Sequence, residues 1–153
     1  MKKIILLAAA FATVFLCACS QKKAAPLSEV FDKVQAQVEL KNFSEYSKAD
    51  SLDRFYGISA DDVEEFAGGV NGTGVSQEEI VLIKAKDAES AKTVKEALDS
   101  RYQSKLSQNK NYNPKQAAMV ERCSVEQNGL YVTMIVSENA EQITETVRQE
   151  LGL

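Results

Sequence analysis

The dipeptide Asn128-Gly129 lies between two segments in which polar and apolar residues alternate. Asn-Gly is the strongest short signal for a two-residue β-hairpin turn, because both central residues of that turn take positive φ angles. With these residues at the centre of the turn, the register places Val125 opposite Val132. One face of the hairpin is then apolar and the other is mixed, which is typical of antiparallel strands covered on one side. The C-terminal part of the chain is therefore expected to contribute to an antiparallel sheet.

The uninterrupted apolar run Ile80-Val81-Leu82-Ile83 predicts a strand that is buried on both faces. Asp87 follows it at the N-cap position of a long helix. The inner stripe of that helix is expected at residues spaced three and four apart: Ala91, Val94, Leu98, Tyr102 and Leu106. Two further amphipathic helices are predicted, one that begins after Pro26 and one that follows a capping box at 139–142 and ends at Gly152.

The segments between these elements are less regular. The glycine-rich residues 66–75 predict a weak edge strand with a glycine bulge or turn, or else a flexible loop that lets a ligand approach the backbone. Residues 43–57 predict a short helix and a turn, Ser59 predicts a helix N-cap, and residues 109–114 predict a polar loop. Together these elements predict an α+β domain, in which a small, mainly antiparallel sheet of about four strands packs against several helices.

The N-terminal residues 1–18 are interpreted as a lipoprotein signal peptide. Lysines near the N-terminus are followed by the uncharged stretch 4–16, which is short of the roughly 20 residues that a membrane-spanning helix needs. The next residues, Leu16-Cys17-Ala18-Cys19-Ser20, resemble the lipobox of bacterial lipoproteins, and this resemblance implies that Cys19 is lipidated. Cys17 is the competing acceptor, but a leucine precedes it where a small residue is expected. An ordinary signal peptide or an uncleaved anchor is the alternative.

Cleavage before Cys19 would leave a lipidated N-terminus and short linker at 19–25, followed by a single α+β domain of unknown function at 26–153. Two or more acyl chains hold a protein stably on a bilayer. The mature protein is therefore expected on the extracytoplasmic side of the cell membrane, with the lipid bilayer as one partner. The sequence leaves open whether the host has an outer membrane.

The sequence contains no His, and its net charge is −4 at neutral pH. Without His, the Ser-His-Asp and Cys-His triads and the His-ligated zinc sites are excluded. The acidic balance argues against nucleic-acid binding, which needs a basic face. Cys123 falls on the apolar face of the predicted hairpin, where a free Cys acts as a small buried hydrophobe; a catalytic thiol is the alternative. The acidic run at 61–65 is interpreted as the first turn of a helix, where carboxylates are stabilising without an ion; a Ca²⁺ site is the alternative, but the alternating ligands of a calcium loop are missing. No metal, cofactor or catalytic residue is predicted.

Several motifs of the mature chain carry a family resemblance: Tyr56-Gly57-Ile58 with Asp61, Glu79-Ile80, Arg101, Tyr112, Pro114 and Gly129-Leu130-Tyr131-Val132. With these residues the chain resembles a family of small extracytoplasmic lipoproteins of low-GC Gram-positive bacteria, defined by a domain of unknown function. The resemblance covers essentially the whole mature domain but contains no catalytic signature. It implies a lipid-anchored extracytoplasmic domain with no assigned reaction.

The interpretation that these observations favour is a membrane-anchored binding or interaction module of the cell envelope, with another envelope protein as its partner. The candidate interaction residues are Arg101 in the long helix, Tyr112 in the polar loop and Tyr131 in the hairpin. A lipoprotein that captures a small molecule or a peptide is the alternative, although one small sheet offers little concavity. An enzyme is the third class: paired carboxylates at 61–65 could support hydrolysis, but nothing in their spacing requires it.

Overall fold

The computed structural model describes residues 24–46 and 50–153. The predicted signal peptide at 1–18, the candidate lipidation site Cys19 and most of the 19–25 linker lie outside the described residues. The elements follow in the order α1 (Leu27–Gln37), β1 (Phe43–Glu45), α2 (Asp50–Tyr56), the 3₁₀ turn η1 (Ala60–Asp62), β2 (Val63–Asn71), β3 (Glu79–Ala85), α3 (Ala88–Tyr112), α4 (Pro114–Glu121), β4 (Ser124–Asn128), β5 (Tyr131–Val136) and α5 (Ala140–Leu151). In the described ranges, no helix has both the length and the apolar character needed to cross a membrane.

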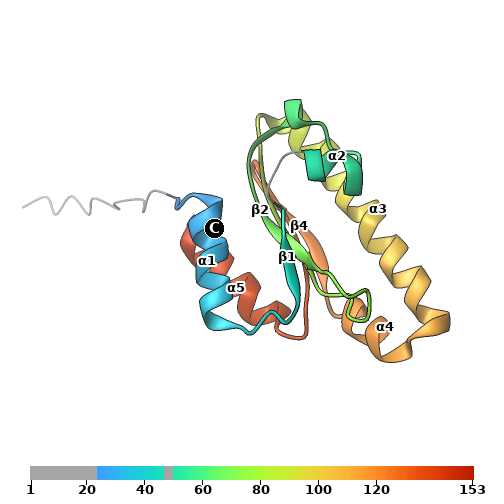
Figure 1. Ribbon diagram of the computed structural model, residues 1–153. Helices are drawn as coiled ribbons and strands as arrows, with labels where there is room; N and C mark the ends of the chain where they lie inside the picture. The colour runs from blue at the N-terminus through green and yellow to red at the C-terminus, as the bar shows by residue number, and fades with distance from the viewer. Residues whose placement is uncertain (1–23, 47–49) are drawn as a thin grey trace, which may run out of the picture.

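The strands form one sheet in the order β1-β2-β3-β5-β4, and every neighbouring pair is antiparallel. Helices α1 and α5 lie on one face of the sheet, whereas α2, α3 and α4 lie on the other (Figure 1). The predicted α+β class and the antiparallel sheet are therefore confirmed. The prediction of about four strands missed β1, a short edge strand that pairs Phe43 with Asn71 at the end of β2.

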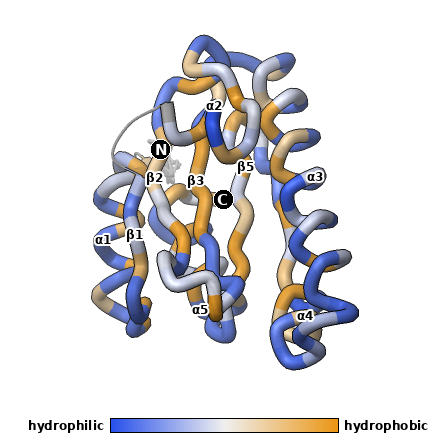
Figure 2. The backbone as a smooth tube through the Cα atoms, turned by 45° about the vertical axis from the view of Figure 1, so that its right-hand side comes forward, coloured by the Kyte–Doolittle hydropathy of each residue, from blue (hydrophilic) through white to orange (hydrophobic). Residues whose placement is uncertain are grey.

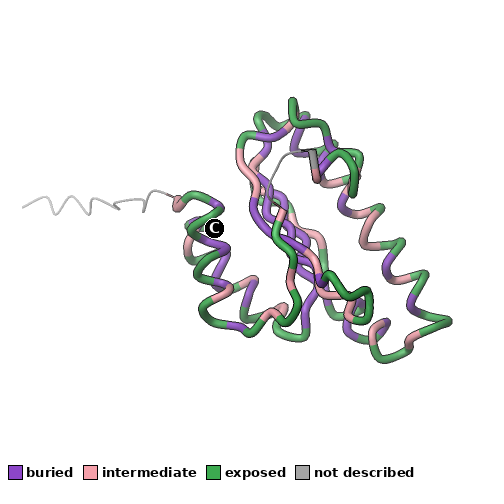
Figure 3. The backbone as a smooth tube through the Cα atoms, in the orientation of Figure 1, coloured by how far each residue is buried: buried purple, intermediate pink, exposed green. Residues whose placement is uncertain are grey.

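Strand β3 occupies the centre of the sheet and is buried on both faces, as the apolar run predicts. Ile80 and Leu82 pack with the apolar residues of α1 and α5, while Val81 and Ile83 pack with those of α3. Figures 2 and 3 show that the central strands β3 and β5 are hydrophobic and buried, and that the outer sides of the helices are hydrophilic and exposed. Each aliphatic side chain buried in this way stabilises the fold by about 1.5–3 kcal/mol.

Helix α3 begins as predicted but is longer. Asp87 caps its N-terminus, where the carboxylate accepts a hydrogen bond from the backbone N–H of Ser90 at 2.8 Å. The predicted inner stripe is buried in the core or packs against it: Ala91, Val94, Leu98, Tyr102 and Leu106. The polar loop predicted at 109–114 is wrong, because α3 continues to Tyr112 and a single residue, Asn113, separates it from α4.

The predicted hairpin forms from β4 and β5, but its turn lies one residue further along the chain. Asn128 pairs with Tyr131, so Gly129 and Leu130 occupy the turn. Gly129 has a φ of +60°, while Asn128 remains in the strand. Glycine at the first turn position is typical of a type II′ hairpin turn, in which only the first of the two central residues needs a positive φ.

Because the turn shifts by one residue, each residue of β4 pairs with a β5 residue two positions further along the chain than predicted. Val125 faces Met134 rather than Val132. Because side chains alternate with a period of two, both registers keep the same residues on each face of the sheet. Cys123 is buried as predicted, although it lies just before β4 rather than within the strand.

The glycine-rich segment at 66–75 is not an edge strand, because β2 lies between β1 and β3. Its glycines permit close approach of the neighbouring backbones. A Cβ atom at Gly68 would lie 2.0 Å from the Ile80 carbonyl oxygen, and one at Gly69 would lie 2.4 Å from that of Ser44. Glycine is therefore required here for packing within the sheet.

Two predicted helix starts differ in detail. Ser59 caps only the 3₁₀ turn η1, where its Oγ accepts a hydrogen bond from Asp61 N at 3.2 Å, and β2 follows directly. The capping box predicted before α5 does not form, because the Asn139 side chain makes no cap hydrogen bond. Instead, Ser137 Oγ accepts a hydrogen bond from Asn139 N at 3.2 Å. The helix ends at Gly152 with a φ of +71°, as predicted.

Candidate functional site

Glu79, the first residue of β3, has no exposed surface. Alternate residues of a strand point to the same side of the sheet, so Glu79 shares the face of Val81 and Ile83, toward α3. Burial of an ionised carboxylate is costly unless opposite charges and hydrogen bonds compensate for it. The neighbouring helices supply both.

Two cations from α3 and one hydroxyl from α2 surround this carboxylate. Arg101 binds both oxygens: its Nε donates to Oε1 of Glu79 at 3.1 Å, and its Nη2 donates to Oε2 at 2.9 Å. Lys105 places its Nζ 2.7 Å from Oε2. The Tyr56 hydroxyl donates to Oε1 at 2.7 Å. Residues four apart on a helix share a face, which is why α3 presents both cations to the start of β3.

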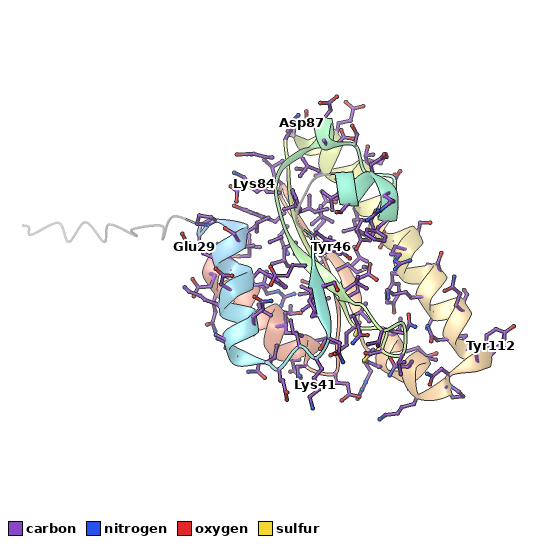
Figure 4. The ribbon with its side chains drawn as sticks, in the orientation of Figure 1. Glu29, Lys41, Tyr46, Lys84, Asp87 and Tyr112 are labelled. Atoms are coloured by element: carbon purple, nitrogen blue, oxygen red, sulfur yellow. The ribbon has the colours of Figure 1, made fainter. Side chains whose placement is uncertain are left out.

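Tyr46, which follows β1, extends these contacts. Its hydroxyl is hydrogen-bonded to that of Tyr56, and the two rings pack edge to face with their centroids 6.0 Å apart. Because Tyr56 donates its single hydrogen to Glu79, Tyr46 must be the donor to Tyr56. Figure 4 shows Tyr46 near the centre of the molecule. We refer to Tyr46, Tyr56, Glu79, Arg101 and Lys105 together as the Glu79 cluster.

The contacts fix the charge of each group in the Glu79 cluster. Burial by itself raises the pKa of Glu79, but the hydrogen bonds from Arg101 and the charges of Lys105 and Arg101 outweigh it and hold that pKa below its ordinary 4.5. Burial lowers the pKa of Lys105, which the Glu79 carboxylate offsets only in part. Burial and the charge of Glu79 raise the pKa of Tyr46 and Tyr56, so both phenols are neutral.

Lys105 is charged nonetheless. Its Nζ lies 2.7 Å from Glu79 Oε2, 3.1 Å from the Gln77 carbonyl oxygen and 3.3 Å from Gln77 Oε1. These three acceptors match the three N–H donors of an ammonium group, whereas a neutral amine has only two. The Glu79 cluster therefore holds two cations and one carboxylate.

The excess positive charge of the Glu79 cluster is accessible through one side chain. Within the described ranges, neither Arg101 nor Lys105 forms a salt bridge with a carboxylate other than Glu79. The Lys105 side chain is 5% exposed, whereas that of Arg101 is 33% exposed. Of the two cations, Arg101 is therefore the one that a ligand can reach.

Arg101 lines a groove of about 370 Å³ between α2 and α3. The groove is also lined by Phe55 and Tyr56 from α2 and by Ala97, Ser100, Ser104 and Gln108 from α3. Phe55 is 42% exposed, and the guanidinium carbon of Arg54 lies 4.8 Å from the centroid of its ring. The groove combines a fixed guanidinium with hydroxyl, amide and aromatic groups, which is a lining suited to recognition.

The three interaction residues predicted from the sequence do not form one site. Arg101 lies at the α2–α3 groove, whereas Tyr112 is 89% exposed on the last turn of α3, far from Tyr46 (Figure 4). Tyr131 packs with the apolar residues of α1 and α5, on the opposite face of the sheet. Of the three, only Arg101 contributes to the Glu79 cluster.

Sequence reasoning missed the partners of Arg101. Tyr56 and Glu79 carry part of the family resemblance, but the sequence gives neither of them a site role. One available signal was the glutamate that opens an otherwise apolar, fully buried strand. A carboxylate in that place needs cations nearby, and Arg101 and Lys105 are spaced to share one helix face.

Two larger depressions lie elsewhere on the surface. One, of about 700 Å³, lies beside β4 and α5, and its charged lining includes Arg148 and Glu126, which neutralise each other at 2.8 Å. The other, of about 670 Å³, is lined by loop residues such as Asn42 and Thr73. Neither is lined by a charged residue that pairs with a buried charge, as Arg101 pairs with Glu79, so the groove at Arg101 is the better candidate for a binding site despite its smaller size.

Cys123 has the features of a structural residue. Its thiol is buried, donates a hydrogen bond to the Met119 carbonyl oxygen at 3.2 Å, and has a pKa that burial raises. A reactive cysteine needs the opposite, a lowered pKa and partial exposure. These features favour the structural interpretation of Cys123 over the catalytic one.

The lowered pKa of Glu79 leads to an expected pH dependence. Stability from a carboxyl group with a lowered folded-state pKa is fully present above the unfolded-state pKa and is lost as pH falls through the folded-state value. The Glu79 contribution is therefore expected to decline only below about pH 4.5. A carboxyl-carbon NMR titration should give Glu79 a midpoint below the ordinary glutamate value of 4.5. An equal or higher midpoint would contradict the proposed charge state.

Comparison with known proteins gives one match. A family model described as a domain of unknown function (DUF4358) matches residues 36–137, well over half of the chain. The matched segment contains every strand and all members of the Glu79 cluster, but neither α5 nor most of α1. No curated protein and no solved structure matches the chain.

Proposed function

Because the chain belongs to the DUF4358 family, a family defined by a domain of unknown function, we propose its function from its own residues. It is a lipoprotein anchored to the extracytoplasmic side of the cell membrane, as the resemblance to small lipoproteins of low-GC Gram-positive bacteria implies. Its folded domain is a module that binds another envelope protein. The binding site is the α2–α3 groove at Arg101.

The observation that carries the binding proposal is the state of Arg101. Its guanidinium is held by the fully buried carboxylate of Glu79, while the side chain as a whole is one third exposed and lines the groove. A side chain immobilised in advance loses little conformational entropy when it binds. The planar guanidinium also presents several donors in a fixed geometry, which suits recognition of a planar acceptor.

The position of the chain start supports a binding face turned away from the bilayer. Ala25 donates its backbone N–H to the Glu150 carbonyl oxygen at 3.2 Å, so the first described residues lie against the end of α5. Ala24 is five residues after Cys19, a span of at most about 18 Å when extended. The α1–α5 layer would then lie near the membrane, and the α2–α3 groove is on the other face of the sheet (Figure 1).

The lipid anchor is tested by replacing its acceptor. Cys19→Ser is expected to abolish incorporation of a clickable palmitate analogue in growing cells and to release the protein from the membrane fraction, because the remaining thiols are not acceptors. Cys17→Ser is the matched control and should label like the wild type. Labelling that persists in Cys19→Ser and disappears in Cys17→Ser would assign the lipid to the other cysteine.

The binding role is tested by site-specific photo-crosslinking on intact cells. A photoreactive amino acid at Ser104 in the groove is expected to crosslink the chain to one recurrent envelope protein. Gln103 is the control position, because it is exposed on the same helix but does not line the groove. Equal yields from both positions, or no product above an unrelated lipoprotein, would count against the proposal.

A further inference from the structure

We propose that the α2–α3 groove binds an acidic segment of the partner protein and that Arg101 pairs with one carboxylate of that segment. This inference rests on the binding function proposed above and names the chemistry of the ligand. Three observations support it: the excess positive charge of the Glu79 cluster, the Arg101 N–H groups that make no hydrogen bond to a described residue, and the shape of the groove.

The Glu79 cluster has two cations and one carboxylate, so a second anion would neutralise it. Arg101 and Lys105 share Glu79 as their salt-bridge carboxylate, and no other described carboxylate pairs with either. An uncompensated charge that is largely removed from water is destabilising. The chain as a whole is acidic, with a net charge of −4, so this local positive charge is not part of a general basic surface. A bound carboxylate would make the cluster neutral.

Arg101 retains donors that could bind that carboxylate. A guanidinium has five N–H donors in a rigid plane. In the described part of the chain, Arg101 donates only through Nε and Nη2, both to Glu79. Its Nη1 makes no hydrogen bond to a described residue, and its side chain is 33% exposed. Glu79 therefore fixes the orientation of the guanidinium and leaves donors for a ligand.

The shape of the groove favours an elongated ligand over a free ion. The α3 residues that line it extend from Ala97 to Gln108, a distance of about 16 Å along the helix axis. Ser100 and Ser104 place hydroxyl groups along this path. At the α2 side, Arg54 does not line the groove itself, but its guanidinium lies over the ring of the lining residue Phe55 and places a second positive charge near the groove. A peptide segment with more than one carboxylate matches this arrangement.

The inference is tested on the full chain purified in detergent, with three probes followed by side-chain NMR of the arginine Nε–H groups. The first probe is a capped, amidated peptide with two central Glu residues. The second is the same peptide with Gln in place of Glu, and the third is acetate. The Arg101 signal is identified by its loss in Arg101→Met. The Glu peptide is expected to shift this signal, at concentrations at which the Gln peptide and acetate leave it unchanged.

Two variants distinguish the effect of direct contact with the peptide from the effect of the excess positive charge. Arg101→Met leaves Glu79 paired with Lys105 and Tyr56, so it should fold and should weaken binding of the Glu peptide at least about tenfold, as expected for a lost charge-assisted hydrogen bond. Lys105→Met removes the excess charge at a side chain that is 5% exposed and cannot touch the peptide. It should weaken binding as well. Arg54→Met is expected to have a smaller effect.

The other possible results of these experiments would overturn the inference. The inference is overturned if the Glu and Gln peptides bind alike, if Arg101→Met binds the Glu peptide as the wild type does, or if no probe binds. Acetate that binds as tightly as the Glu peptide would identify a site for small carboxylates and would overturn the acidic-segment assignment. If the Ser104 photo-crosslink persists in Arg101→Met, the binding function stands and only the carboxylate inference fails.

Discussion

Glu79→Gln is expected to destabilise the fold by about 3–5 kcal/mol, the usual cost of removing one partner of a buried ion pair. The change leaves Arg101 and Lys105 without a counter-charge, and Lys105 is almost fully buried. It also replaces one carboxylate oxygen with an NH2 donor, which in either orientation of the amide faces the donors that Arg101 and Tyr56 or Arg101 and Lys105 present to Glu79. Urea unfolding followed by circular dichroism should show a large fall in the midpoint with little change in slope.

Two further variants test the origin of this loss. Glu64→Gln removes an exposed carboxylate that pairs with Lys84 at 2.8 Å, and such surface pairs contribute only about 0–1 kcal/mol. Glu79→Gln combined with Lys105→Met removes a buried cation together with the buried carboxylate, so it should regain part of the lost stability. If Glu79→Gln costs no more than Glu64→Gln, the Glu79 cluster is not a buried ionic network.

Gly68→Ala is expected to be comparably damaging, at about 3 kcal/mol or more, because strain and steric overlap act together. Gly68 has a φ of +135°, which residues with side chains rarely adopt. Its new Cβ would lie 2.0 Å from the Ile80 carbonyl oxygen, so β2 and β3 would have to separate. Because this pairing lies in the centre of the sheet, thermal unfolding should show a much lower midpoint.

Gly129→Ala is the matched control for this substitution. Gly129 also has a positive φ, of +60°, but a Cβ there would have no neighbouring atom within 4 Å. Only the conformational cost remains, which is about 1–2 kcal/mol. If both substitutions lower the midpoint equally, close packing of β2 against β3 is not the reason that position 68 requires glycine.

The candidate site was only partly predictable from the sequence. Arg101 was identified, but the sequence grouped it with Tyr112 and Tyr131, which lie elsewhere. Its actual partners come from elements far apart in the chain: Glu79 is 22 residues away and Tyr56 lies in α2. A sequence pattern reports the spacing of residues along one element, and it carries no information on which elements meet.

The fold, too, was only partly predictable from the sequence. The sequence alone was sufficient for features whose causes are local, such as the buried run of β3, the Asp87 cap of α3 and the Gly152 end of α5. Each depends on residues within one or two turns or on a continuous apolar run. The edge position predicted for the glycine-rich strand was wrong, because β1 pairs with β2 and takes the edge position itself. No pattern in the sequence of β1 predicts this pairing.

The hairpin shows most clearly what required tertiary structure. The alternating pattern correctly predicted two antiparallel strands and their buried faces, but a register shift of two positions leaves those faces unchanged. The pattern therefore could not distinguish a turn at Asn128-Gly129 from the observed turn at Gly129-Leu130. In the folded chain, β5 is aligned on the central strand, with Lys84 opposite Tyr131, and β4 pairs with β5 so that Asn128 lies opposite Tyr131. The same pairing brings Glu79 to the end of the sheet where α3 supplies its two cations, and long-range contacts of this kind exist only in the folded chain.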